Sequence, residues 1–185
     1  MSVTEFVQYR RKREGRTNYK KRLTYLKSEK PRLVIRKTNK QVVLQIVEYH
    51  PDGDKIICGV TSSNLKPLGW KYALSNLPAC YLAGMLLAKK AHEKKVKHAI
   101  VDFGLQTSIA GSRLYAALKG AIDGGLDVPA DESALPAAER LNGSHISNHF
   151  ANAEAQRFSR YKSEKLDASK MPADIEAVKK KIMAK

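Results

Sequence analysis

Residues 32–61, RLVIRKTNKQVVLQIVEYHPDGDKIICGVT, decide the fold. Three runs in this stretch have the length and the Val/Ile content of β-strands: Arg32 to Lys37, Gln41 to Tyr49 and Asp54 to Thr61. Leu33 and Ile35 share one face of the first run, and its two arginines share the other face with Val34. The connections are short and rich in turn residues, above all Pro51-Asp52-Gly53. The stretch therefore predicts an antiparallel meander of three strands.

After the meander, the pattern changes to alternating helices and strands. Apolar residues at helical spacing follow Asn76, and Pro78 falls in the first turn, where its missing N–H does no harm. Three further elements are expected: a buried parallel strand over His98 to Gly104, a helix from Gly111-Ser112 to Gly124-Gly125, and a short strand over Leu126 to Pro129. The sequence thus predicts an α/β fold with a mixed sheet, in which the antiparallel meander precedes a parallel strand and helices pack on the sheet.

Charge and composition divide the chain into three regions. Residues 1–40 hold 14 Lys/Arg and 3 Asp/Glu, so they carry +11 of the chain's net charge of +16. We expect a basic N-terminal arm over residues 1–30, an α/β core over 31–130 and a helical C-terminal extension over 131–185. The helices expected in the extension run from Pro136 to Leu141, from Ser144 towards Phe158, and onward from Pro172.

The extension is too poor in apolar residues to form a core of its own. Its last expected helix is amphipathic, with Ile175, Val178 and Ile182 on one side. We therefore expect the extension to pack on the α/β core or on a partner.

A net charge of +16 favours a polyanionic partner, either nucleic acid or an anionic membrane. The arm interleaves its cations with Tyr9 and Tyr19. Arginine side chains suit phosphate oxygens and base edges, and tyrosine rings can stack on bases. A membrane-binding helix would need a continuous apolar face, which residues 8–22 lack. The arm therefore favours RNA, and we expect no membrane partner.

Other classes of protein are disfavoured. Cys58 and Cys80 alone indicate no disulfide framework and fit a reducing, cytoplasmic compartment. The longest apolar run is too short to cross a bilayer, and we expect no signal peptide because the first residues lead directly into basic sequence. His145 and His149 have a spacing that can share a metal, but no third ligand follows nearby. We expect no metal, no cofactor and no small-molecule substrate.

A metal-dependent nuclease is the alternative from another functional class. Asp102 lies in the expected parallel strand, where a carboxylate can hold Mg²⁺ together with others for phosphodiester cleavage. The first strand supplies no second carboxylate. The competing interpretation is that Asp102 pairs with a local arginine or accepts a hydrogen bond from a loop N–H.

Five segments, in their order and spacing, resemble one protein family. They are residues 9–19 (YRRKREGRTNY), 30–37 (KPRLVIRK), 77–91, 102–104 and 111–129 (GSRLYAALKGAIDGGLDVP). The family is that of the 5S-rRNA-binding proteins of the large ribosomal subunit, called protein L-eighteen in bacteria and archaea and L-five in eukaryotes. The match covers nearly the whole chain and weakens after about Phe150. The basic start and the chain length resemble the archaeal members.

The resemblance implies a ribonuclease-H-like sheet with an antiparallel second strand and a structural, non-enzymatic role. It implies binding of 5S rRNA, anchoring of that RNA in the central protuberance, and contact with large-subunit rRNA. Neighbouring large-subunit proteins, including a second 5S-binding protein, are further implied partners. The implied location is the large ribosomal subunit in the cytoplasm. A small-subunit ribosomal protein of related topology is the third interpretation.

The resemblance also assigns RNA contacts to positions of this chain. Those on the arm are Arg10, Arg11, Arg13, Arg16, Tyr19, Lys20 and Arg22. Those on the first strand are Arg32 and Arg36, on the face away from the core, and Lys37 at the hairpin follows them.

Three more implied contacts lie outside the arm and the meander. Trp70 and Lys71 resemble an aromatic-basic loop, and Arg113 opens the second helix of the core. Trp70 fits an anchor in the protein's own core equally well. Residues 106–110 depart from the more basic loop of the family, which leaves contacts there open.

Overall fold

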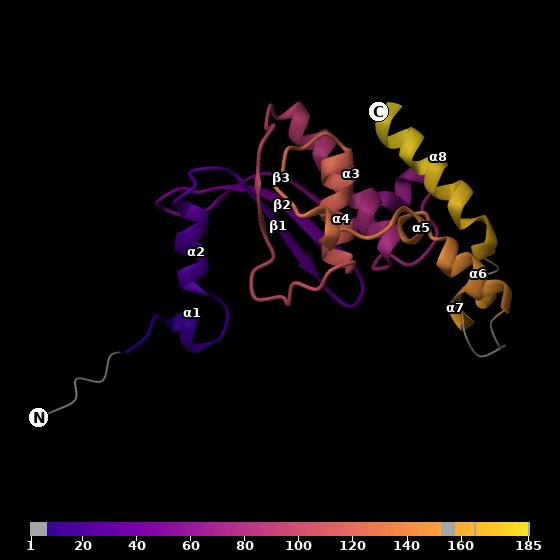
Figure 1. Cartoon of the computed structure of the whole chain (residues 1–185), viewed down its shortest axis with the longest axis horizontal. Helices are drawn as coiled ribbons and strands as arrows, with labels where there is room; N and C mark the ends of the chain where they lie inside the picture. Colours follow the sequence, from indigo (N-terminus) through magenta and orange to yellow (C-terminus); the bar gives the residue numbers. More distant parts are fainter. Residues whose placement is uncertain (1–6, 153–157, 165, 185) are drawn as a thin grey trace, which may run out of the picture.

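A four-stranded sheet lies at the centre of the computed structural model, which describes residues 7–152, 158–164 and 166–184 (Figure 1). Its strands are β1 (Arg32–Lys37), β2 (Val42–Glu48), β3 (Lys55–Thr61) and β4 (Ile100–Asp102). Their order is β3-β2-β1-β4. Strand β2 is antiparallel to both of its neighbours, and β4 is parallel to β1. The predicted mixed sheet is confirmed, with the antiparallel second strand that the resemblance implied.

One face of the sheet is apolar because side chains alternate between the two faces along each strand. Leu33 and Ile35 of β1 are fully buried, and so are Leu44 and Ile46 of β2. Leu33 is paired with Ile46 and Ile35 with Leu44, so the four side chains form one continuous apolar surface. The opposite face therefore carries the two arginines of β1.

Two helices cover the apolar face, α3 (Leu77–Glu93) and α4 (Arg113–Asp123). The side chain of Asn76 caps α3 by accepting a hydrogen bond of 2.9 Å from the N–H of Ala79. Pro78 occupies the first turn of α3, as expected, because that turn has no use for its missing donor. The start of the longest helix is thus encoded locally.

Glycines allow α3 and α4 to approach backbone to backbone. A Cβ atom added at Gly84 of α3 would overlap the carbonyl oxygen of Ala117 in α4. A Cβ atom at Gly120 of α4 would overlap the carbonyl oxygen of Tyr81 in α3. Since any side chain at these two positions would force the helices apart, the glycines set the distance between them.

The C-terminal extension packs on the core at the end of the molecule away from the arm (Figure 1). Its elements are η2 (Glu132–Ala134), α5 (Ala138–Leu141), α6 (Ser144–Asn152), α7 (Ser159–Ser163), η3 (Ala168–Lys170) and α8 (Met171–Ala184). The side chains of Met171, Ile175, Val178 and Ile182 in α8 are buried, which confirms the expected amphipathic helix. The Nζ of Lys89 in α3 donates to the carbonyl oxygen of Ile182 at 2.7 Å, near the C-terminal end of α8.

The N-terminal arm lies on the other side of the sheet from α3 and α4 (Figure 1). It contains the short α1 (Arg10–Arg13) and α2 (Tyr19–Leu26), which begins at the cap Asn18. Neither of these helices, both within the described residues 7–152, has a buried residue. The arm therefore rests on the domain without adding to its core.

Four sequence-based expectations need correction or limits. Residues 126–129 form no strand in the described structure; a single bridge joins His98 and Asp127 there, and Pro129 has no N–H to extend it. Residues 63–76, which the sequence predicts to be a loop because they hold Pro67 and Gly69, lie largely after the 3-10 helix η1 (Ser62–Leu68), which occupies the start of this stretch. The helix expected over 136–141 begins only at Ala138. Beyond α6, the helix expected to run towards Phe158 enters residues 153–157, which lie outside the described residues.

Candidate nucleic-acid interface

A cleft of about 370 Å³ lies between the arm and the arginine-bearing face of the sheet. The arm contributes α1, α2 and the turn between them, and the sheet contributes β1, β2, the start of β3 and the end of β4. Its cationic lining residues are Arg11, Arg16, Lys21, Arg22, Arg32 and Arg36, and its acidic ones are Asp54 and Asp102. We call it the arm cleft. The arm and the strand arginines, which the sequence assigned separately, thus meet in one place.

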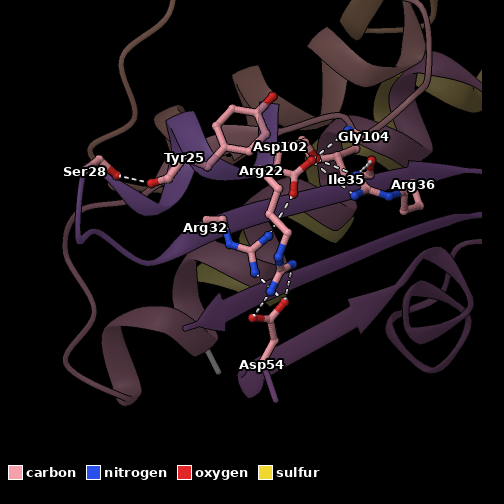
Figure 2. Close-up of polar contacts among 9 residues, drawn as sticks. All are labelled: Arg22, Tyr25, Ser28, Arg32, Ile35, Arg36, Asp54, Asp102 and Gly104. Atoms are coloured by element: carbon pink, nitrogen blue, oxygen red, sulfur yellow. Dashed lines mark hydrogen bonds and ion pairs between the residues drawn. The ribbon is translucent and has the colours of Figure 1, made fainter. Parts of the chain in front are cut away.

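Five of these side chains form a continuous chain of ion pairs, which we call the ion-pair chain (Figure 2). Arg22 of the arm donates to both carboxylate oxygens of Asp54, at 2.9 and 2.8 Å. Asp54 also accepts from Arg32 at 2.5 Å, and Arg32 reaches Asp102 at 3.1 Å. Arg36 closes the chain with a contact of 3.2 Å to the other oxygen of Asp102. The ion-pair chain therefore joins the arm to β1, β4 and the residue before β3.

Burial increases from the arm towards the sheet. The side chain of Arg22 is 32% exposed, whereas that of Arg32 is 5% exposed and that of Asp102 is 7% exposed. Asp102 accepts a further hydrogen bond of 2.7 Å from the N–H of Gly104, and Arg36 donates to its carbonyl oxygen at 2.6 Å. A buried charge needs this density of partners, because it has lost its water.

The outer pair also shifts proton affinities. The hydrogen bond from Arg22 is the largest influence that lowers the pKa of Asp54, and the bond from Arg32 lowers it further. The same bond to Asp54 raises the pKa of Arg22, against the opposing effect of burial. Both groups are therefore charged at neutral pH, and the arm is attached through a bidentate guanidinium–carboxylate contact.

The other predicted cations of the arm are exposed, although Arg11 and Arg16 line the arm cleft and Arg11 donates to the hydroxyl of Thr17 at 2.9 Å. Arg10, Arg11, Arg13, Arg16 and Lys20 are all exposed. Glu14 pairs weakly with two of them, at 3.4 Å from the Nε of Arg10 and 3.3 Å from the Nε of Arg16. These groups are free to bind anions, because exposed ion pairs of this kind exchange readily with other partners.

Two tyrosines add stacking surface to the arm. The rings of Tyr9 and Tyr19 lie 5.3 Å apart between centroids. Tyr9 is 70% exposed and Tyr19 is 36% exposed, so each offers ring surface to a base.

The predicted contacts outside the arm cleft have different environments. Lys37 exchanges backbone hydrogen bonds with the side chain of Gln106, at 3.1 and 2.8 Å, which ties the hairpin to the 106–110 loop. Lys71 is exposed. Arg113 opens α4, as predicted, and donates to the carbonyl oxygen of Ser75 at 3.2 Å.

Trp70 is an anchor of the core. It is 2% exposed, and its Nε1 donates to the carbonyl oxygen of Ala73 at 3.1 Å. The ring therefore faces the protein interior, which is the second of the two roles that the sequence left open.

Sequence reasoning missed Asp54, Lys21 and Tyr25 among the residues of the cleft. Asp54 was assigned only to the start of a strand, and nothing in its neighbourhood signalled two arginine partners. Lys21 and Tyr25 also line the cleft. Lys21 belongs to the same basic run as Lys20, so its membership of the run was a usable signal.

The structure does not favour catalysis at Asp102. Both of its carboxylate oxygens face arginines, as the competing interpretation of this residue anticipated. Among the described residues, no three His, Cys, Asp or Glu side chains gather in a way that could hold a metal ion.

No helix in the described parts of the chain is long and apolar enough to span a bilayer.

A family model described as "Ribosomal large subunit proteins 60S L5, and 50S L18" matches residues 5–99 and 89–131. The chain belongs to this family. Three archaeal relatives, each named large ribosomal subunit protein uL18, match nearly the whole chain. The protein of Korarchaeum cryptofilum is 42% identical over 183 residues, which cover 96% of this chain and 94% of the relative. That of Thermofilum pendens is 43% identical (95% and 93%), and that of Methanobrevibacter smithii is 40% identical over 180 residues (95% and 93%).

Membership of the uL18 family decides between the three interpretations. The chain is a structural protein of the large ribosomal subunit, located in the cytoplasmic ribosome, and it is not an enzyme. The nuclease and small-subunit alternatives are therefore wrong, and the family resemblance seen in the sequence is confirmed.

Proposed function

We propose that this uL18-family chain binds 5S rRNA through its arm and the arm cleft, and thereby anchors that RNA in the central protuberance. Large-subunit rRNA and neighbouring proteins, including a second 5S-binding protein, are the other proposed partners. The observation that carries the proposal is the cluster of exposed arm cations beside the cleft, held against the sheet by Arg22 and Asp54.

The cationic side chains have two roles in this proposal. Arg10, Arg11, Arg13, Arg16 and Lys20 contact phosphates, because they are exposed and at most weakly paired. Tyr19 stacks on an unpaired base, as aromatic residues do in single-stranded RNA recognition. Lys37, Lys71 and Arg113 remain proposed contacts at the edge of the interface.

The ion-pair chain positions these contacts. Arg22 and Arg32 are bound to carboxylates and Arg32 is buried, so both orient the arm and leave phosphate binding to the exposed groups. Arg36, whose side chain is 39% exposed, has room for an RNA oxygen in addition to Asp102. We assign no RNA contact to Trp70, because its ring is buried.

The test is a filter-binding titration of the full chain with 5S rRNA at several salt concentrations. Changing Arg10, Arg11 and Arg13 to Gln should lower the log–log salt slope by about 2–3, since each phosphate contact contributes roughly 0.7–0.9. The control changes Lys66, Lys170 and Lys180 to Gln, which removes the same charge from exposed positions outside the arm cleft. Equal slopes for the two triple variants would refute the assignment of RNA binding to the arm.

A further inference from the structure

A second basic depression, of about 890 Å³, lies at the end of the sheet where β1 begins and α3 ends. Five lysines from three segments of the chain converge on it: Lys30, Lys55, Lys94, Lys95 and Lys97. We call it the lysine groove. Glu29 and Glu48 are the acidic residues of its lining, so cations predominate.

Within residues 7–152, 158–164 and 166–184, the ammonium groups of the lysine groove have no carboxylate partner. All five lysines are exposed, and in the described parts of the chain none of their Nζ atoms makes a hydrogen bond or an ion pair. The arm cleft differs, because Asp54 and Asp102 there form ion pairs with Arg22, Arg32 and Arg36. His98, also in the groove, is engaged with Asp127 at 2.6 Å. The lysine groove therefore holds an excess of positive charge, on ammonium groups that no ion pair among the described residues engages.

The backbone brings the lysines together at some conformational cost. Lys94 follows the end of α3, and Lys95 has a φ of 61°, in the left-handed region where glycine is the least strained residue. This turn reverses the chain and carries Lys97 and His98 towards the start of β1, where the N–H of Ile100 donates to the carbonyl oxygen of Pro31 at 2.9 Å. The lysines thus converge where the sheet and α3 end.

The lysine groove adjoins the arm cleft. Ile56 of β3 is 55% exposed and lines both depressions. A ligand that is long and anionic along its length can therefore leave the arm cleft, cross β3 at Ile56 and enter the groove. An RNA backbone has this form, since it carries one charge per nucleotide.

We propose that the lysine groove binds a second stretch of phosphodiester backbone, in the same RNA that the arm engages. This inference rests on the proposed RNA binding of the arm and extends it to a separate surface. Lysine ammonium groups act as point charges on phosphates, so the groove adds affinity and fixes the path of the RNA without reading its sequence. An acidic protein is the competing occupant, and the experiment below separates the two.

The experiment compares two triple variants of the full chain by filter binding. The groove variant changes Lys55, Lys94 and Lys97 to Gln and leaves Lys95 intact because of its backbone conformation. The control is again the triple change of Lys66, Lys170 and Lys180 to Gln, which removes three exposed charges from outside the groove. Thermal melting by circular dichroism verifies that both variants are folded. The two probes are 5S rRNA and an RNA duplex of about 20 base pairs with an unrelated sequence.

The expected result is a loss of affinity by the groove variant of roughly 10- to 100-fold on both probes, with a salt slope lower by about 2. The control variant should bind both probes as the unaltered chain does. If the groove variant and the control bind equally on both probes, the inference is overturned, and the groove is left to an acidic protein. If instead the unaltered chain shows no preference for 5S rRNA over the duplex, the proposed function fails, while a loss on the duplex still supports the groove.

Discussion

The arm and the C-terminal extension are both helical additions to the same α/β core, but they are attached by different forces. Helix α8 of the extension buries four apolar side chains, whereas the arm's α1 and α2, both fully described, bury none. The arm is attached instead through the Arg22–Asp54 contact at the outer end of the ion-pair chain. The two attachments differ in strength, because apolar burial is worth several kcal/mol and a partly exposed ion pair about 1 kcal/mol.

The difference shows how one chain can assign stability of the fold to one region and binding of a partner to another. Cations that are consumed in internal ion pairs cannot also neutralise a partner, so a weakly attached arm keeps most of its charge available. The apolar extension contributes to the fold and leaves the arm free of that task. Three changes test this division, and they follow in order of expected effect.

The largest effect is expected from Ile175→Ala in α8. Ile175 is fully buried, so its truncation should lower the free energy of unfolding by about 4 kcal/mol. Leu23→Ala in α2 should change it by less than about 0.5 kcal/mol, since Leu23 is 57% exposed. Urea unfolding followed by circular dichroism measures both. If the two variants lose comparable free energies of unfolding, the arm is part of the core. The same conclusion would follow if removal of residues 1–22 abolished the cooperative unfolding transition.

An intermediate effect is expected from Asp102→Asn in β4. The change removes the charge that compensates the buried guanidinium of Arg32, which should cost about 3 kcal/mol of stability. Asp54→Asn should cost only about 1 kcal/mol, since the side chain of Asp54 is 26% exposed and water can replace part of its role. Should both variants unfold at the same urea concentration, the ion-pair chain would not be graded between sheet and arm.

The smallest effect on stability is expected from lowering the pH, which protonates Asp54. The pKa of Asp54 is lower in the folded chain than in the unfolded one, so its contribution is complete above the unfolded value of about 4. That contribution is lost as the pH falls through the lower, folded pKa. The amide NMR signals of α2 should therefore shift towards those of a detached arm in that range, while the signals of α8 stay in place.

A suitable control for the acid titration is Asp52→Asn. The side chain of Asp52 is 93% exposed, so its loss should leave the titration of α2 unchanged. An α2 that keeps its signals down to pH 2 would show that Asp54 does not hold the arm.

Much of the fold was predictable because its determinants are local. The alternation of Leu33 and Ile35 fixes the face of β1, and the Asn76 cap with Pro78 fixes the start of α3. The expected strand over 126–129 was wrong because Pro129 lacks the N–H that a longer ladder would need. The β-strand propensity of residues 126–129 did not compensate for this missing donor.

The arm cleft was only partly predictable, because its contacts join residues far apart in sequence. The basic run indicated which side chains carry charge, but the pairing of Arg22 with Asp54 spans 32 residues. No spacing rule encodes such a contact, which depends on how β3 follows β2 in space. The burial of Arg32 has the same origin, because its partner Asp102 lies 70 residues further along the chain, in β4. The predicted RNA contacts themselves stay predictions.

The chain's only tryptophan lies at the seam between the core and the extension. Trp70 packs against Tyr72 at 5.2 Å between ring centroids, and the hydroxyl of Tyr72 donates to Asp174 at the start of α8. The fluorescence emission of Trp70 should therefore report whether the extension is packed on the core. The same emission should not respond to the arm, which lies on the opposite side of the sheet. Fluorescence can therefore follow the extension while RNA is added at the arm.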